Sequence, residues 1–134
     1  MPTYKDVMLG MKKAMADASP WFQVEWPNST PESYTFPYVE FSFSFLNPTD
    51  ETLDSSDEHI NGIVAIDVVV EKDTSVEVLA EVVDFIRDTF PRGRRIHYGV
   101  LPTTILITES PSPKRPVENG VYSKTPIIVN YRTE

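Results

Sequence analysis

The chain has 134 residues, with 20 acidic against 12 basic side chains, a net charge of −8 and no cysteine. This length fits one domain with a single hydrophobic core, and no apolar run is long enough to cross a membrane. The lack of cysteine excludes disulfides and thiolate metal sites. The acidic balance argues against general nucleic-acid binding, because affinity for phosphates comes from lysine and arginine.

Residues 3 to 17 are predicted to form the first helix. Apolar side chains recur there at helical spacing, Thr3 is the expected N-cap, and Asp6 suits the first turn. Ser19 and Pro20 end the helix. Its apolar stripe is expected to contain Tyr4, Val7, Met8, Met11 and Met15.

Two strands are predicted after an aromatic and proline-rich connector. The stretch YVEFSFSFL alternates between apolar and polar residues, which indicates one buried and one exposed face. The stretch NGIVAIDVVVEK is apolar on both faces near its middle and is predicted to be a central, covered strand. Asp67 stands within this run, and we expect it to face solvent or a neighbouring subunit. Residues 46–61, between the two strands, are expected to form a long polar loop.

A second helix is predicted at residues 75–90, begun by a capping box of Thr74 and Glu77 and ended by Pro91 and Gly93. The stretch TTILITES indicates a third strand, and Asn119-Gly120 is a strong hairpin signal. Pro126 lacks a backbone donor, so we expect the last strand to start there, at an edge or a bulge.

These elements predict a single α+β domain over residues 1–134, with two helices packed on a mostly antiparallel sheet. The core is expected to combine one face of each helix with the inward face of the strands. Its predicted members are Met8, Met11, Phe41, Phe43, Val64, Ile66, Val68, Leu79, Val83 and Ile86.

No catalytic residues, metal ligands or cofactor site are predicted. His59 and His97 each lack a second histidine or cysteine at a ligand spacing. The acidic residues around His59 do not follow the order of a calcium loop, and no phosphate-binding or nucleophile motif occurs. We therefore do not expect an enzyme.

The stretch FPRGRR places Arg92, Arg94 and Arg95 within four residues of one another, and we call residues 90–95 the arginine turn. Cations just past a helix end are favoured by the helix dipole, by roughly 0.3–1 kcal/mol each. That benefit explains one or two of them. We therefore interpret the three arginines as a protein-docking patch and not as a DNA contact, because three cations on an acidic body are too few for duplex affinity.

Several stretches taken together resemble the tail terminator, or tail completion, proteins of long-tailed phages, of the lambda type. They are WPN at residues 26–28, FPYVEFSF, GIVAIDVVV followed by a helix ending in IRDTFPRG, and the C-terminal NGVYSKTPIIVNYR. The similarity covers nearly the whole chain in order. The long acidic loop and Ser123-Lys124-Thr125 before Pro126 depart from the pattern of this family. These departures affect the surfaces through which such a protein would contact its neighbours.

The resemblance implies a homohexameric ring on the head-proximal end of the finished tail tube. Such a ring ends tube polymerisation and joins the major tail tube protein to the head–tail connector protein. Genomic DNA passes through it without specific binding. The protein would be part of the virion, assembled in the cytoplasm of the host bacterium, with no membrane and no cofactor involved.

A closed ring needs two different patches on each subunit. The arginine turn and the acidic loop are the expected two sides of this contact. On the acidic side we expect Asp50, Glu51, Asp54, Asp57 and Glu58 to take part, and these residues and the three arginines are candidates for contact with a neighbouring subunit or with the tube.

Three alternatives stay open at this point. The first is another head–tail connector or neck completion protein, which would share the job but occupy a different position in the virion. The second is a small cellular ligand-binding domain, which would be a stable monomer with a deep apolar pocket. The third is an enzyme, which a reproducibly bound metal or substrate would reveal.

Overall fold

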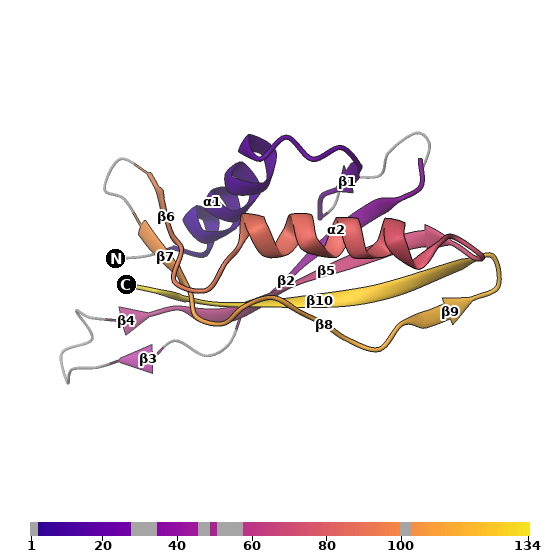
Figure 1. Cartoon of the computed structure of the whole chain (residues 1–134). Coiled ribbons are helices and arrows are strands. Elements are labelled where there is room, and N and C mark those ends of the chain that lie inside the picture. The colour runs from indigo at the N-terminus through magenta and orange to yellow at the C-terminus, as the bar shows by residue number, and fades with distance from the viewer. Residues whose placement is uncertain (1–2, 28–34, 46–48, 51–57, 100–102) are drawn as a thin grey trace.

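In the computed structural model, two helices pack on a curled, mostly antiparallel sheet, which confirms the predicted α+β class (Figure 1). The structure describes residues 3–27, 35–45, 49–50, 58–99 and 103–134. The helices are α1 (Tyr4–Asp17) and α2 (Val76–Thr89). The strands are β1 (Gln23–Glu25), β2 (Tyr38–Phe45), β3 (Thr49–Asp50), β4 (Glu58–His59), β5 (Asn61–Glu71), β6 (Arg95–Tyr98), β7 (Thr103–Ile107), β8 (Ser112–Pro113), β9 (Val117–Asn119) and β10 (Tyr122–Thr133).

The main sheet has the strand order β1-β2-β5-β10-β7-β6, and β8 and β9 also pair with β10. The pairing of β1 with β2 is parallel, and the other pairs in the described part of the chain are antiparallel. As predicted, β5 is central, because β2 and β10 flank it on both sides. The strands β3 and β4 form a separate two-stranded pair.

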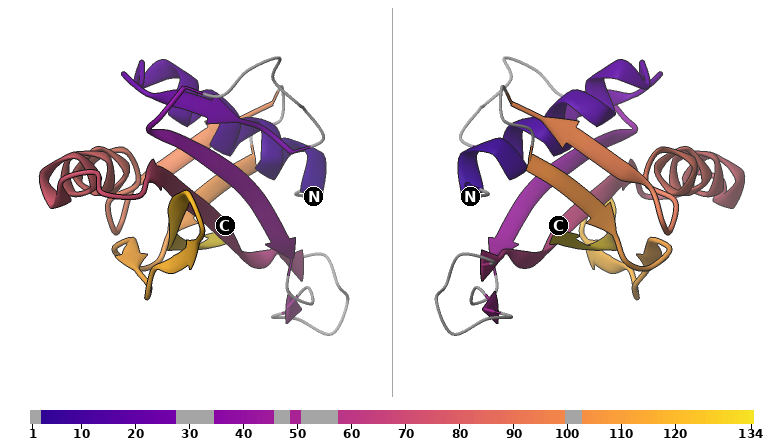
Figure 2. Two further views of the ribbon diagram at one scale, coloured as in Figure 1. Left: turned by 90° about the vertical axis from the view of Figure 1, so that its right-hand side faces the viewer. Right: turned by 90° about the vertical axis from the view of Figure 1, so that its left-hand side faces the viewer.

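The two helices cover the same face of the sheet but different parts of it (Figures 1 and 2). Helix α2 packs on β5 through Val82 and Ile86, and Phe90, at the end of the helix, is also fully buried. Helix α1 packs on β6 and β7. At Gly10 the approach is so close that a Cβ would lie 2.9 Å from Ile105 Cδ1. A side chain at this position would therefore require the buried Ile105 side chain to shift.

The predicted core is confirmed for most of its members. Six of them are buried: Met11, Phe41, Val64, Ile66, Val68 and Ile86. Phe43, Leu79 and Val83 are partly buried and pack against this cluster.

The sequence analysis placed the buried face of α1 too far towards Tyr4 and Met8. Tyr4 is 41% exposed, and Met8 is half-buried. The buried face instead includes Gly10 and Ala14. The small size of these two residues lets the helix backbone approach the sheet, and hydrophobic periodicity gives small residues little weight.

The cap of α1 follows the prediction, whereas that of α2 does not. The Asp6 backbone N–H donates to Thr3 Oγ1 over 3.1 Å. The N-cap of α2 is Ser75, whose side chain makes no capping hydrogen bond. Because the helix begins one residue later than a Thr74 cap requires, Thr74 and Glu77 do not stand in the positions of a capping box.

The last strand differs from the prediction in where it starts. β10 begins at Tyr122 and runs through Pro126 in unbroken register with β5. The Pro126 carbonyl accepts a hydrogen bond from the Lys114 N–H, on the side away from β5. The N and O of one strand residue point to the same side, so the missing donor also faces away from β5 and no hydrogen bond to β5 is lost.

The predicted hairpin is present between β9 and β10. Asn119 and Tyr122 are cross-strand partners, so the two central turn residues are Gly120 and Val121. Gly120 has a φ of +63°, as the first central residue of a type II′ turn requires.

Several strands escaped the sequence pattern, among them β1, which lies inside the expected connector, and β8. The strand β6 begins within the arginine turn, and its sole fully apolar residue, Ile96, gives no alternation to recognise. Inside the expected loop at residues 46–61, β3 and β4 pair with each other. Residues 46–48 and 51–57 lie outside the described residues.

The packing of α2 gives a direct test of the core. We expect Ile86→Ala to lower the free energy of unfolding by about 2–5 kcal/mol, because a fully buried side chain leaves a cavity. Leu79→Ala removes a side chain of similar size from a half-buried position on the same helix and should cost clearly less. Chemical denaturation measures both. Equal losses would show that the two positions are equally buried.

Candidate functional site

The arginine turn connects α2 to β6 and is fixed to β7 by backbone hydrogen bonds. The Gly93 N–H donates to the Ile107 carbonyl over 2.8 Å, and the Ile107 N–H donates to the Arg94 carbonyl over 2.9 Å. Gly93 has a φ of +89°, in the left-handed region that glycine adopts without strain. The turn therefore presents its side chains from a rigid backbone.

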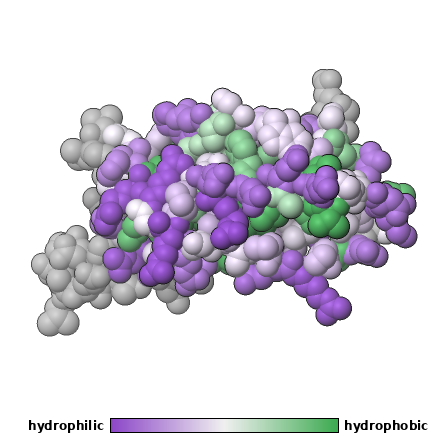
Figure 3. All heavy atoms as spheres, viewed as in Figure 1, coloured by the Kyte–Doolittle hydropathy of each residue, from purple (hydrophilic) through white to green (hydrophobic). Residues whose placement is uncertain are grey.

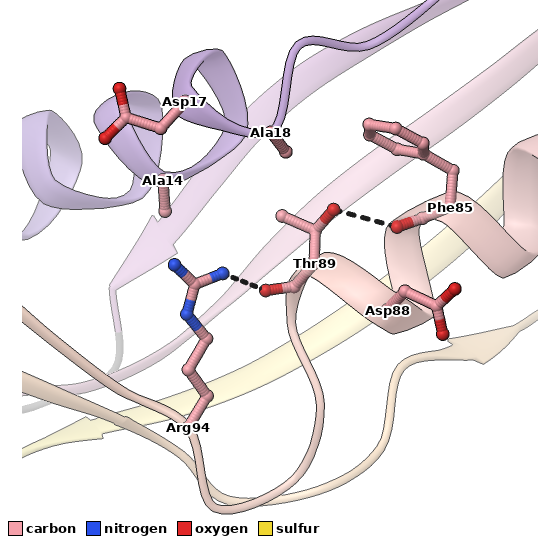
Figure 4. Close-up of a pocket in the computed structure, with 7 residues that line it drawn as sticks. All are labelled: Ala14, Asp17, Ala18, Phe85, Asp88, Thr89 and Arg94. Atoms are coloured by element: carbon pink, nitrogen blue, oxygen red, sulfur yellow. Dashed lines mark hydrogen bonds between the residues drawn. The ribbon is translucent and has the colours of Figure 1, made fainter.

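The Arg94 side chain is hydrogen-bonded within the chain. Its Nη1 donates a hydrogen bond to the carbonyl oxygen of Thr89, the last residue of α2 (Figure 4). The guanidinium thus satisfies a carbonyl at the negative end of the helix dipole. Thr89 in turn donates its Oγ1 hydroxyl to the Phe85 carbonyl over 2.8 Å.

Arg95 and Arg92 differ in their environment. Arg95 Nε lies 3.0 Å from one carboxylate oxygen of Glu134 and 3.2 Å from the other. Arg92 is exposed and makes no ion pair with any residue that the structure describes. The arginine turn therefore holds one arginine that ends a helix, one in a surface ion pair, and one directed to solvent.

A groove lies beside the arginine turn, between the C-terminal ends of the two helices. Its volume is about 410 Å³, and Arg94 projects into it below Asp17 (Figure 4). Asp17 is held by Lys13, with a distance of 2.6 Å between Nζ and Oδ2. The lining residues are Ala14, Asp17, Ala18, Phe85, Asp88, Thr89 and Arg94. Sequence reasoning missed this groove because its two walls are some 70 residues apart in the chain.

The acidic side of the predicted contact is described in part. Asp50 and Glu58 are backbone partners in the β3–β4 pair. Glu51, Asp54 and Asp57 lie outside the described residues. In the two views of Figure 2, the β3–β4 pair and the end of α2 lie on opposite sides of the molecule. Within one chain the two sides of the predicted contact are therefore kept apart.

The sheet face opposite the helices carries a row of charged residues. Glu40 on β2 and Asp67 on β5 are cross-strand partners, and Lys124 Nζ lies 3.2 Å from Glu40 Oε2. Burial raises the pKa of the Asp67 carboxyl; Glu40 raises it further, and Lys124 opposes the shift. Burial alone would lower the pKa of Lys124, but the hydrogen bond and charge of Glu40 raise it. Asp67 is thus the carboxylate of this row that lacks its own cation.

Comparison with known proteins now assigns the family. The family model described as phage tail terminator protein matches residues 6–131. The chain belongs to the phage tail terminator family. The family is structural, so this terminator is a component of the virion tail that interacts with other tail components. The lambda type stays a prediction.

A solved structure supports the fold of this terminator. Its chain is 14% identical to this one, with a TM-score of 0.80, and the similarity covers 100% of this chain and 97% of the other. At this level of identity the likeness concerns the fold alone. A search of curated proteins gives no match.

Neither a metal site nor a membrane helix stands out in the described part of this terminator. Its described residues contain no group of three acidic, histidine or cysteine side chains placed to hold a metal ion. They also contain no helix that is long and apolar enough to span a membrane.

The unequal roles of the arginines can be measured by the same substitution at two positions. We expect Arg94→Ala to lower the free energy of unfolding by about 1–2 kcal/mol, because a helix-ending hydrogen bond and a dipole interaction are lost. Arg92→Ala should change it by less than about 0.5 kcal/mol, as exposed substitutions do. Thermal or chemical denaturation compares them, and a larger loss for Arg92→Ala would contradict this assignment.

The charged row predicts opposite effects for two isosteric substitutions. The pKa of Asp67 is raised above its ordinary value of 3.8, so its ionised form opposes folding once the pH exceeds that value. Asp67→Asn should therefore stabilise the protein at pH 7, and this gain should vanish as the pH falls below 3.8. Glu40→Gln should instead cost up to about 1 kcal/mol at pH 7, because it weakens the pair with Lys124.

Denaturation curves of both variants at several pH values provide the measurement. A destabilising effect of Asp67→Asn at pH 7 would show that Lys124 pairs with Asp67 and not with Glu40.

Proposed function

We propose that this chain forms a closed homohexameric ring that caps the head-proximal end of the tail tube. The ring ends tube polymerisation and offers its other surface to the head–tail connector protein. Membership of the phage tail terminator family supports this role. The observation that carries it is the location of the arginine turn and the β3–β4 pair on opposite sides of one subunit.

The location of these two patches on opposite sides of a subunit matters because a ring closes through contacts between neighbouring subunits. A cyclic assembly needs a head-to-tail contact between two different patches of the same chain. Two oppositely charged patches on the same side would pair within one chain or give a closed dimer. Patches on opposite sides of a subunit can meet only between neighbouring subunits, and each pair of neighbours repeats the contact.

We assign the basic side of this contact to Arg92. Arg94 and Arg95 already have partners within the chain, so their guanidinium groups would have to leave these to bind a neighbour. Arg92 is exposed and stands on a rigid turn. Its partner in the ring is the acidic segment around β3 and β4, with Asp50 and Glu58 at its described ends.

The charge of the chain is consistent with a passage for DNA. A net charge of −8 repels phosphates, so a ring of such subunits does not retain the genome as it passes. A structural cap also requires neither a metal nor a cofactor. The protein acts in the virion tail after assembly in the cytoplasm of the host bacterium.

Charge reversal tests the contact without disturbing the fold. Arg92→Glu should impair ring formation on tail tubes, because it places like charges together, while Arg92→Lys should retain most of it. Adding Asp50→Lys and Glu58→Lys to Arg92→Glu should restore part of the assembly. Each exposed pair contributes about 0–1 kcal/mol, but a ring repeats the pair at every subunit.

Negative-stain images and the length of tubes polymerised with each variant provide the readout. Wild-type protein that stays monomeric even on tail tubes would contradict the proposed function. If Arg92→Glu assembles normally but loses measurable DNA binding at physiological salt, the arginine turn is a nucleic-acid contact instead. Binding to a portal complex but not to tail tubes would favour a connector completion protein.

A further inference from the structure

Helix α2 carries its acidic residues on one exposed side, which we call the acidic face of α2. At 3.6 residues per turn, these residues lie within roughly 60° of one another around the helix axis. In Figure 3, hydrophilic side chains form a row across the middle of the molecule, where Figure 1 shows α2. The members of this face are Glu77, Glu81, Asp84 and Asp88, and all four are exposed.

The acidic face of α2 is not neutralised within the chain. None of its four carboxylates makes an ion pair with a residue that the structure describes. The only cation within α2 is Arg87, which is exposed and lies to one side of this face, roughly 60° from Asp84. Like charges on adjacent turns repel one another, so a cationic surface placed against this face would be attracted to it.

The outer side of α1 has the opposite charge, and we call it the lysine face of α1. Lys5 and Lys12 are two helical turns apart, so they lie on the same side of the helix. Both are exposed, and neither makes an ion pair with a described residue. The third lysine of α1, Lys13, is held by Asp17. Lys12 Nζ instead lies 5.3 Å from the centroid of the Trp26 ring.

The acidic residues closest in sequence to the lysine face are held elsewhere. Asp6 Oδ2 accepts a hydrogen bond of 3.4 Å from the Thr103 hydroxyl, and Glu25 is half-buried in β1. Between the two lysines, the half-buried Met8 and Leu9 line a groove of about 150 Å³. The lysine face is therefore a cationic surface with an apolar centre.

The two faces match in spacing as well as in charge. Lys5 and Lys12 are seven residues apart, which is about 10 Å along a helix. Two pairs on the acidic face have this same separation, so each pair can lie opposite both lysines at once. Ala80, which is exposed beside the acidic face, would then lie against the apolar centre of the lysine face. The two pairs are Glu77 with Asp84 and Glu81 with Asp88.

The two faces cannot meet within one chain. Ala14 and Ala18 line the groove that α1 shares with α2, and Lys12 lies on the opposite side of α1 from Ala14. In Figure 2, α2 and the arginine turn lie on one side of the subunit, and the start of α1 and the β3–β4 pair lie on the other. Each side thus carries one basic and one acidic surface, in reversed order.

We propose that the acidic face of α2 in one subunit docks against the lysine face of α1 in the next copy of this chain. The contact is head-to-tail, as a ring requires. This inference rests on the proposed ring and adds to the charged contact of Arg92 a second contact of reversed polarity. Two contacts of opposite polarity fix the orientation of a neighbour, because an inverted neighbour would bring like charges together.

Carbodiimide cross-linking, which joins a lysine directly to a carboxylate, tests this contact in rings assembled on tail tubes. Peptide mapping should find Lys5 or Lys12 joined to a carboxylate of the acidic face. Rings made from a mixture of isotope-labelled and unlabelled subunits show whether the link joins two copies. Lys124 and Glu40, whose Nζ and Oε2 atoms are 3.2 Å apart within one chain, provide the internal positive control.

Charge reversal provides a second measurement. Lys5→Glu combined with Lys12→Glu should raise the protein concentration needed for ring formation more than about tenfold, because like charges then face each other. The matched control is Lys114→Glu with Arg115→Glu, which reverses two exposed cations between β8 and β9 and should leave ring formation unchanged. Thermal unfolding of each variant subunit shows that the fold is intact.

Restoring the charge match should recover ring formation. Reversal of one acidic pair, added to the two lysine substitutions, brings opposite charges together again, so at least one of the two combinations should assemble better than the lysine variant alone. The two combinations add either Glu77→Lys and Asp84→Lys or Glu81→Lys and Asp88→Lys.

The outcomes separate this inference from the proposed function. Rings that form normally with both lysines reversed, and that give no cross-link between the lysine face and the acidic face, would overturn the docking and leave the ring intact. Cross-links from Lys5 or Lys12 to the tube protein in place of a second copy would also overturn it. A protein that forms no ring on tail tubes would refute both proposals.

Discussion

The pairing of β5 with its two neighbours determines the rest of the structure. β10 follows β5 in one register from Tyr122 opposite Glu71 to Arg132 opposite Asn61, and β2 pairs with the other edge of β5 from Tyr38 to Phe45. A shift of one residue would turn every buried side chain to the opposite face. Gly62 helps to fix this register. A Cβ there would lie 2.4 Å from Tyr131 Oη and 2.7 Å from the Ser44 carbonyl oxygen, so Tyr131 fits only over a residue without a side chain.

This sheet places the candidate contact surfaces relative to one another. At one end of the sheet β5 leads into α2, and the Lys72 N–H donates to the Val121 carbonyl beside the start of β10. Helix α2 then runs back along the sheet and is followed by the arginine turn, which backbone hydrogen bonds hold against β7. The β3–β4 pair lies on the opposite side of the subunit. The two sides differ in charge and shape, which is the asymmetry that a head-to-tail assembly needs.

Polar and apolar contacts have different tasks in such an assembly. The exposed Arg92 and the acidic residues across the interface would set orientation and register, since exposed ion pairs contribute little free energy each. An apolar anchor would supply most of the stability of the contact. In the proposed ring, the net charge of −8 per subunit would oppose binding to nucleic acid, which suits a passage for DNA.

The sequence alone determined the α+β class, the central strand β5, both helices and most of the core, because these depend on hydrophobic periodicity over many residues. Resemblance in several stretches also identified the family, which the match over residues 6–131 confirms. Patterns of one or two residues were less informative. The capping box of α2 was wrong because the helix starts one residue later, and Pro126 did not start the last strand because its missing donor faces away from β5.

Only the tertiary structure decided what the arginines do. The sequence presents three equivalent cations in four residues, but Arg94 reaches back to the Thr89 carbonyl, Arg95 meets Glu134 some 39 positions away, and Arg92 points to solvent. The same holds for the groove between the C-terminal ends of the two helices, whose walls come from distant parts of the chain. Local patterns record which side chains are apolar or charged. Which of them share a surface depends on strand register and on how closely each helix approaches the sheet.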